Sequence, residues 1–367
     1  MATQSLAAKI SGRVMWFLVV GTLLWMAFIA PFTSVFALLS GDVFYTWWAN
    51  SLLISPLPFL VLFGVFRTRN SVIRWWVYQY LGVSAICFSG VLIGILLSFV
   101  LPAVAAGKIA LLLCLLFCAW GIYAAHRIHV VKLAIVSEKI KKNVRLVQIS
   151  DVHVGSRRGA YLEKVLKLVD TQKPDILAIT GDLLDRNVSA ADLSSLAKLA
   201  YPVFYCSGNH ERYVDYEKAL GNIAKQGVTV LSDSATSCLG LRVVGIEDRQ
   251  NVSDAEHALD KLQASEVPDP TPFSVLLYHQ PNLWECAKRH CIDLTLSGHT
   301  HKGQIWPFRL IVRTRYRYLA GFFKSTSGDL FVSQGAGTWG PIMRFGSRCE
   351  ITVLDLEGDG LRDLETT

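Results

Sequence analysis

The stretch Leu296-Ser297-Gly298-His299-Thr300-His301 places two imidazoles two residues apart, directly after a glycine. The short apolar run 291–296 leads into it and predicts a buried strand. In open α/β sheets, functional sites lie beyond the carboxyl ends of the strands. A strand that ends in Gly-His-x-His therefore predicts a site at that edge of a sheet.

Four other apolar runs end in the same way, in a carboxylate, an imidazole or an amide. The predicted strands 144–149, 175–179, 203–206 and 274–278 lead into Asp151 and His153, Asp182, Asn209 and His210, and His279, respectively. Five strand ends thus deliver oxygen and nitrogen ligands to one place, and no cysteine stands among them. Such a set suits a pair of divalent cations of borderline hardness, such as Mn, Zn, Fe or Co.

The rest of the second part of the chain alternates between strand and helix patterns, which predicts an α/β domain. Further strands are predicted at 130–136, 228–231, 241–246, 330–333 and 350–354. Helices are predicted at 160–171, 192–200, 216–226, 255–264 and 283–289.

The first third of the chain is too apolar for a soluble protein. The 367-residue chain is 52% hydrophobic, and the excess lies in four uncharged runs. A membrane-spanning helix needs about 17–25 apolar residues, so the runs predict four transmembrane helices at about 14–40, 43–66, 75–101 and 108–126. We therefore expect a transmembrane region at 1–128 and a separate domain at 129–367.

Lysines and arginines indicate the orientation of these helices. They lie before the first run, between the second and third, and after the fourth, whereas the opposite loops hold only Asp42 and Lys108. This pattern predicts a multi-pass integral membrane protein, in a bacterial inner membrane, with both termini and the second domain cytoplasmic. Eight cysteines without zinc-ribbon or CxxC spacing favour free thiols, which agrees with a reducing compartment.

The net charge of +7 has a source in these juxtamembrane bases, which face anionic lipid. No nucleic-acid-binding motif accompanies it, so a nucleic-acid partner is not expected. The segment Trp306–Lys324 mixes four arginines with six aromatic residues. It fits two interpretations equally: an interfacial segment that lies on the bilayer beside the site, or a strand hairpin with one arginine-bearing solvent face.

The strand-end motifs occur in an order and at spacings that resemble the calcineurin-like metallophosphoesterases. The motifs are Asp151-Val152-His153, Gly181-Asp182-Leu183-Leu184-Asp185, Gly208-Asn209-His210-Glu211, His279 and Gly298-His299-Thr300-His301. The resemblance covers about residue 130 to the C-terminus and not the membrane part. The tail Gly303-Gln304-Ile305, with the later Gly335-Ala336-Gly337-Thr338, is similar to the bacterial membrane-associated branch. The family resemblance implies a domain of two mixed sheets sandwiched by helices.

The resemblance also implies a role for each motif residue. Asp151, His153 and His301 would hold one divalent metal, Asn209, His279 and His299 would hold a second, and Asp182 would bridge the two. His210 would protonate the leaving oxygen or stabilise charge on the phosphoryl group, and Asp185 would orient His210. The nucleophile would be a metal-bridging hydroxide. Arg157 and Arg186 follow ligand loops, and we hypothesise that either contacts the substrate phosphate, because guanidinium binds phosphate in bidentate fashion.

Together these features predict a membrane-anchored, dinuclear-metal phosphoesterase that hydrolyses a phosphodiester or pyrophosphate bond. A lipid-linked substrate is the preferred subclass, because anchoring favours a substrate already in the membrane; a nucleotide diester and a phosphoprotein stay open. The alternative is a membrane sensor or scaffold whose domain binds metal without turnover. A complete ligand set with His210 present favours the enzyme. A transport module is disfavoured because no helix shows paired intramembrane charges.

Overall fold

The computed structural model describes residues 30–41, 70–157, 159–186, 188–265 and 271–359. Within the chain, contacts separate two compact units. The first comprises residues 1–123 together with the short segments 305–307 and 340–345. The second comprises residues 124–304, 308–339 and 346–367. Each unit is described by itself.

The described part of the first unit is helical, with α2 (Ala30–Ser40), α5 (Ser71–Leu97) and most of α6 (Ala103–His126). Asn70 caps α5, because its side-chain oxygen accepts the backbone N–H groups of Val72 and Ile73. Small residues let α5 and α6 approach closely: a Cβ added at Gly94 would clash with Ala110. The segment 340–345 packs into the same unit, where the Arg344 backbone N–H donates to the Gly121 carbonyl at 2.9 Å.

In the described residues two helices, not four, are long and apolar enough to cross a membrane: α5 and α6. They begin at 71 and 103 rather than at the predicted 75 and 108. Because it begins earlier, α5 includes a basic residue, Arg74, that the predicted helix 75–101 did not contain. The predicted helix 43–66 lies outside the described residues, and so does 14–29 of the first one, of which only the 11-residue α2 is described.

The second unit contains two six-stranded mixed sheets. The first has the order β1-β12-β2-β3-β4-β5, from strands Ile128–Val136, Cys349–Glu357, Val144–Ile149, Ile176–Thr180, Val203–Cys206 and Thr229–Val230. The second has the order β10-β11-β9-β8-β7-β6, from strands Gly321–Phe323, Asp329–Val332, Leu294–Ser297, Phe273–Leu277, Leu241–Gly245 and Ser234–Cys238. Strands β2 to β5 are parallel, as are β7, β8, β9 and β11.

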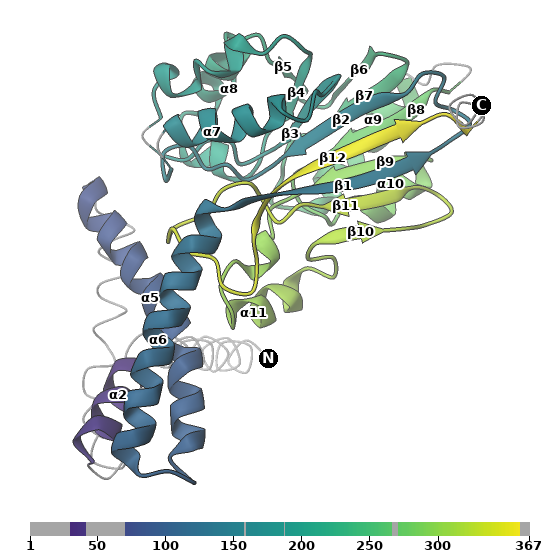
Figure 1. Ribbon diagram of the computed structural model, residues 1–367. Coiled ribbons are helices and arrows are strands. Elements are labelled where there is room, and N and C mark those ends of the chain that lie inside the picture. Colours follow the sequence, from purple (N-terminus) through teal and green to yellow (C-terminus); the bar gives the residue numbers. More distant parts are fainter. Residues whose placement is uncertain (1–29, 42–69, 158, 187, 266–270, 360–367) are drawn as a thin grey trace, which may run out of the picture. The chain divides into compact units, whose positions relative to one another are not determined.

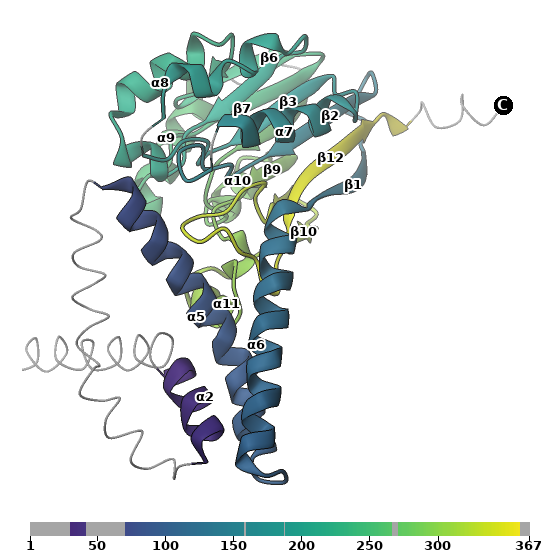
Figure 2. The same cartoon turned by 60° about the vertical axis from the view of Figure 1, so that its left-hand side comes forward.

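Three apolar layers hold these sheets and their helices together. Figures 1 and 2 show the strands and helices of this unit. Inward side chains of both sheets share one core. The other face of the first sheet packs on α7 (Gly159–Asp170) and α8 (Tyr216–Ala224). The other face of the second sheet packs on α9 (Val252–Ser265) and α10 (Trp284–Arg289). The α/β domain of two mixed sheets sandwiched by helices is confirmed.

Two predicted elements differ from the structure. The helix expected at 192–200 is instead two 3-10 turns, Ala190–Leu193 and Leu196–Lys198. The hairpin interpretation of Trp306–Lys324 is wrong, because the segment forms the helix α11 (Phe308–Arg315) before the edge strand β10. Arginines are good helix formers, whereas the aromatic residues favoured the strand pattern.

Candidate metal centre

The structure brings all seven predicted metal ligands to loops that follow strands. Asp151 and His153 follow β2, Asp182 follows β3, Asn209 follows β4, His279 follows β8, and His299 and His301 follow β9. The carboxyl ends of parallel strands meet at one edge of each sheet, and these loops extend from those ends. Two sheets therefore contribute to one centre.

The backbone at this centre is strained. Positive φ angles occur at Asp151 (54°), His153 (54°), Asp182 (49°), His299 (70°) and His301 (47°). Such values are uncommon outside glycine and cluster at functional sites. Two glycines permit the close approach of the loops, because a Cβ at Gly208 would strike Asp182 and one at Gly298 would strike Ser150. These backbone conformations allow the ligand side chains of neighbouring loops to lie close together.

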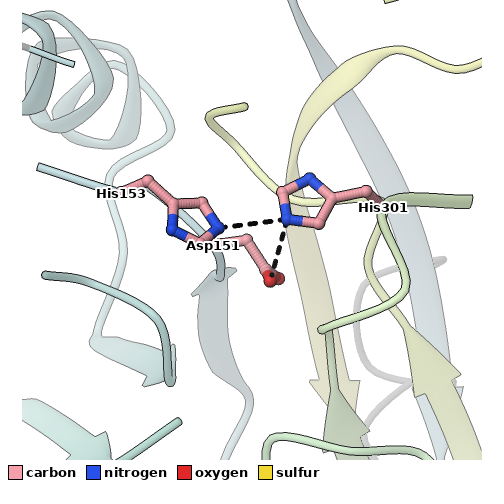
Figure 3. A group of neighbouring side chains, drawn as sticks. All are labelled: Asp151, His153 and His301. Carbon is pink, nitrogen blue, oxygen red and sulfur yellow. Dashed lines mark hydrogen bonds and ion pairs between the residues drawn. The ribbon is translucent and has the colours of Figure 1, made fainter. Parts of the chain in front are cut away.

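Asp151, His153 and His301 form one group of ligand atoms (Figure 3). The Nε2 atoms of His153 and His301 are 3.1 Å apart. His301 Nε2 lies 3.3 Å from Asp151 Oδ1. The two rings and the carboxylate point toward one another from two loops, one after β2 and one after β9, as the first predicted metal site requires.

Asp182, His279 and His299 form a second group. His279 Nε2 lies 3.2 Å from Asp182 Oδ2 and 3.1 Å from His299 Nδ1. Asn209 joins them, with its Oδ1 3.2 Å from His279 Nε2. The same Asp182 oxygen lies 3.9 Å from His153 Nε2 of the first group, so Asp182 stands between the two groups.

The hydrogen bonds around the second group suit a bound cation. The Nδ1 of His279 is 2.9 Å from the Thr180 carbonyl, which can only accept, so Nδ1 carries a proton and Nε2 faces the centre. His299 Nε2 is 2.7 Å from the Tyr316 hydroxyl, which leaves Nδ1 facing the centre. His279 Nε2 and His299 Nδ1 face each other at 3.1 Å, so a proton or a cation must lie between them. The residues therefore fit a divalent metal.

The pKa shifts of the site residues also suit metal binding. Burial, aided by the charge of His210, lowers the pKa of His153 to about 3, and burial with the charge of His279 lowers that of His299 to about 4. Both rings are neutral and able to donate a lone pair. Burial opposes ionisation of Asp182, yet the surrounding imidazoles hold its pKa well below the usual range. Burial likewise opposes charge on His279, but Asp182 holds the pKa of that ring well above its usual value.

His210 lies at the edge of the centre, where Asp182 and Asp185 face its two ring nitrogens. Its Nε2 is 3.9 Å from Asp182 Oδ2, and its Nδ1 is 3.5 Å from Asp185 Oδ1. Although burial opposes it, these two carboxylates raise the pKa of His210. Asp185 is itself held by the Ser156 hydroxyl. His210 is thus placed to carry a proton beside the metal ligands.

The two arginines predicted to contact substrate are placed differently. Arg157 is 4% exposed, and its guanidinium donates to Thr338 Oγ1 at 3.1 Å and to the Ala125 carbonyl at 2.7 Å. It also stacks over Tyr161. This geometry assigns Arg157 to packing within the domain rather than to phosphate. Arg186 is exposed, and its contact with substrate stays a prediction.

Glu211 is a buried carboxylate whose structural role the sequence analysis did not recognise. It accepts backbone N–H groups from Asp182 at 3.1 Å, Leu184 at 2.8 Å and Gly208 at 2.8 Å. Burial and the Asp182 carboxylate raise the pKa of Glu211 to about 7, although the hydrogen bonds from Leu184 and Gly208 lower it. Glu211 therefore ties the loop after β3 to the loop after β4, and its place directly after His210 was the available signal.

A hydrogen-bonded chain behind His299 was also missed. His299 Nε2–H donates to the Tyr316 oxygen, and the Tyr316 hydroxyl donates to Gln280 Oε1 at 3.0 Å. Gln280 Nε2 in turn donates to Asp248 Oδ1 at 2.7 Å. Such outer contacts fix the ring orientation of metal ligands. No motif spacing marks Tyr316, so the sequence offered no signal for it.

Comparisons with known proteins identify metallophosphoesterases as relatives of this chain. A family model described as calcineurin-like phosphoesterase matches residues 144–303. An uncharacterized metallophosphoesterase of Aquifex aeolicus is 32% identical over 244 residues, which cover 64% of this chain and 93% of that protein. One of Helicobacter pylori strain 26695 is 35% identical over 233 residues, covering 60% of this chain and 61% of its own length.

A zebrafish (Danio rerio) protein named transmembrane protein with metallophosphoesterase domain is 29% identical over 282 residues, covering 70% of this chain and 64% of that protein. The chain spans about three fifths of the length of the Helicobacter and Campylobacter relatives that it matches. Since the Aquifex protein is matched almost throughout, the chain belongs to the calcineurin-like metallophosphoesterase family.

Proposed function

We propose that this protein is a membrane-anchored, dinuclear-metal phosphoesterase that hydrolyses a phosphodiester or pyrophosphate bond. The observation that carries the proposal is the pair of ligand groups that share Asp182, with the facing ring nitrogens of His279 and His299 3.1 Å apart in the second group and His210 beside both. Asp151, His153 and His301 would hold one ion, and Asn209, His279 and His299 the other. Mn, Zn, Fe and Co all suit this donor set.

When bound, two divalent cations supply Lewis acidity toward the phosphoryl oxygens and a water of lowered pKa as nucleophile. The chain's own residues supply the rest. His210, with its raised pKa, holds a proton on Nε2 that it gives to the leaving oxygen. Asp185 orients the ring through Nδ1. The His210 backbone N–H donates to Asp182 Oδ1 at 2.8 Å, which fixes the acid relative to the shared ligand.

Two exposed aromatic residues beside His210 support an organic ester as substrate. Tyr213 and Trp339 are 53% and 47% exposed, with ring centroids 4.8 Å and 5.9 Å from that of His210. A leaving group with an apolar or planar part can pack against them. The two candidate membrane helices add support for a lipid-linked substrate, because anchoring concentrates the enzyme where such a substrate resides.

The alternative of a sensor or scaffold that binds metal without turnover requires only the ligands. The His210–Asp185 pair belongs to neither of the two ligand groups that share Asp182, and its place beside them favours catalysis.

The test is hydrolysis of bis(p-nitrophenyl) phosphate by the purified full-length protein, with Mn²⁺ and with chelator. We expect metal-dependent turnover, loss of bound metal in Asp182→Asn, and a loss of about 10²–10⁴-fold in kcat with metal retained in His210→Ala. Metal binding without turnover of this diester or of an aryl pyrophosphate would favour the sensor instead.

A further inference from the structure

We propose that α11 is an interfacial helix that lies on an anionic lipid surface and connects that surface to the metal centre. This inference rests on the proposed function and names the environment from which the site takes its substrate: the headgroup layer of a bilayer.

The outward face of α11 is apolar and uncovered. None of its eight residues is buried, and Leu310 and Ile311 are 53% and 49% exposed. With about 100° of rotation per residue, Leu310, Ile311 and Thr314 share one face. Arg313 and Arg315 lie on either side of that face. An apolar strip flanked by arginines is the arrangement of helices that rest in the headgroup region.

The charge of this region has one sign. Between Asp293 and Asp329 the chain holds six lysines and arginines and no acidic residue. Among the described residues no carboxylate forms an ion pair with Arg313 or Arg315. Each basic residue near an anionic bilayer contributes about 1 kcal/mol to binding. The complementary partner is therefore an anionic surface that also accepts Leu310 and Ile311, and a lipid bilayer satisfies both conditions.

Both ends of α11 contact the loop that carries two metal ligands. At its start, Gly303 lies so close to Arg309 that a Cβ on the glycine would strike the Arg309 backbone. At its end, the Tyr316 backbone N–H continues the helical pattern to the Val312 carbonyl, and the Tyr316 hydroxyl bonds His299 Nε2 at 2.7 Å. A helix fixed in this way places its outer face at a constant position relative to His299 and His301.

The test places the photo-crosslinking residue p-benzoylphenylalanine at Ile311 in the full-length protein, reconstituted in nanodiscs of phosphatidylcholine with or without phosphatidylglycerol. The matched control places it at Leu239, an apolar residue of 44% exposure in the β6–β7 turn. We expect lipid adducts at position 311, more with phosphatidylglycerol, and none at 239. Arg313→Glu with Arg315→Glu should lower the yield of lipid adducts at position 311 at least fivefold and remove its increase with phosphatidylglycerol. Lys225→Glu with Lys261→Glu should leave the adduct yield and its increase with phosphatidylglycerol unchanged.

The absence of lipid adducts at 311, or adducts with a protein instead, would overturn the inference. Hydrolysis of bis(p-nitrophenyl) phosphate, measured on the same samples, separates this outcome from failure of the proposed function. A protein that hydrolyses the soluble diester without lipid contact at α11 is a phosphoesterase that does not use this helix.

Discussion

At the scale of single residues, Glu211 is the clearest case of a side chain that acts by holding the backbone. Glutamine in its place would turn an amide N–H₂ toward at least one of the three N–H donors that the carboxylate now accepts. Because a buried donor without an acceptor costs about 1–3 kcal/mol, we expect Glu211→Gln to lower the free energy of unfolding by that amount. Urea titration of the protein in detergent measures it. Glu217→Gln, at an exposed position on α8, is the control and should change stability by less than about 0.5 kcal/mol.

His279 predicts how metal affinity depends on pH. Since Asp182 holds the pKa of His279 well above its usual value, the ring is protonated at neutral pH before metal binds. Metal must displace that proton, so affinity should rise with pH, by about tenfold per unit for one proton released. Equilibrium dialysis against Mn²⁺ at pH values from about 6 to about 8 measures the slope of metal affinity against pH. The weaker binding by His279→Asn should show a shallower slope, and equal slopes would contradict the assignment.

Trp339 is expected to affect substrate binding, measured as KM, and not the catalytic step, measured as kcat. Removing an aromatic contact is worth about 0.5–1.5 kcal/mol. Trp339→Ala should therefore raise KM for an aryl phosphodiester by about two- to tenfold while kcat stays nearly constant, and Trp339→Phe should recover most of the loss. Steady-state kinetics of both variants decide this. A fall in kcat with unchanged KM would show that Trp339 acts through His210 instead.

At the scale of elements, the loop between β11 and β12 supports the centre without supplying a ligand. The backbone N–H groups of Ala336 and Gly337 donate to the Ser150 and Asp151 carbonyls at 2.7 and 2.9 Å. A Cβ at Gly337 would strike the Val152 carbonyl. Gly337→Ala should thus displace the loop after β2 and lower both stability, by about 1–3 kcal/mol, and metal affinity.

Gly221→Ala in α8 is the matched control, since nothing lies within 4 Å of a Cβ at that position. This change should stabilise the helix by about 0.5–1 kcal/mol. Thermal unfolding followed by circular dichroism, with metal content measured on the same samples, distinguishes the two. Equal behaviour of both variants would show that the loop tolerates displacement.

The sequence predicted those elements whose signals are local. Strand ends in Asp, His or Asn indicated the candidate ligands together with His210, because a parallel strand delivers its last residues to a known edge, and the family resemblance implied which seven of them hold metal. Tyr316 and Gln280 could not be found in this way, since their contacts depend on the packing of α11 against the loop after β9. The predicted contact of Arg157 with substrate depended on packing in the same way. A guanidinium after a ligand loop can turn toward phosphate or toward a carbonyl, and packing directs that of Arg157 to the Ala125 carbonyl.

At the scale of the whole molecule, the membrane orientation predicted from the placement of lysines and arginines can be tested by labelling a cysteine thiol. All eight cysteines lie in the described part of the chain, and only Cys291 is exposed. Burial raises the pKa of Cys286 to about 11 and that of Cys206 well above its usual range, so both stay protonated near pH 8 and react slowly. A maleimide that cannot cross membranes should therefore report the location of the second unit through Cys291.

If the catalytic domain is cytoplasmic, as the lysines and arginines that flank the apolar runs predict, inverted membrane vesicles should be labelled and sealed right-side-out vesicles should not. Cys291→Asn is the control, because asparagine tolerates the positive φ of 52° at this position, and it should abolish the signal. Labelling of right-side-out vesicles would place the domain on the opposite side. It would then exclude any substrate confined to the cytoplasmic leaflet, while leaving the arrangement of ligands around Asp182 unaffected.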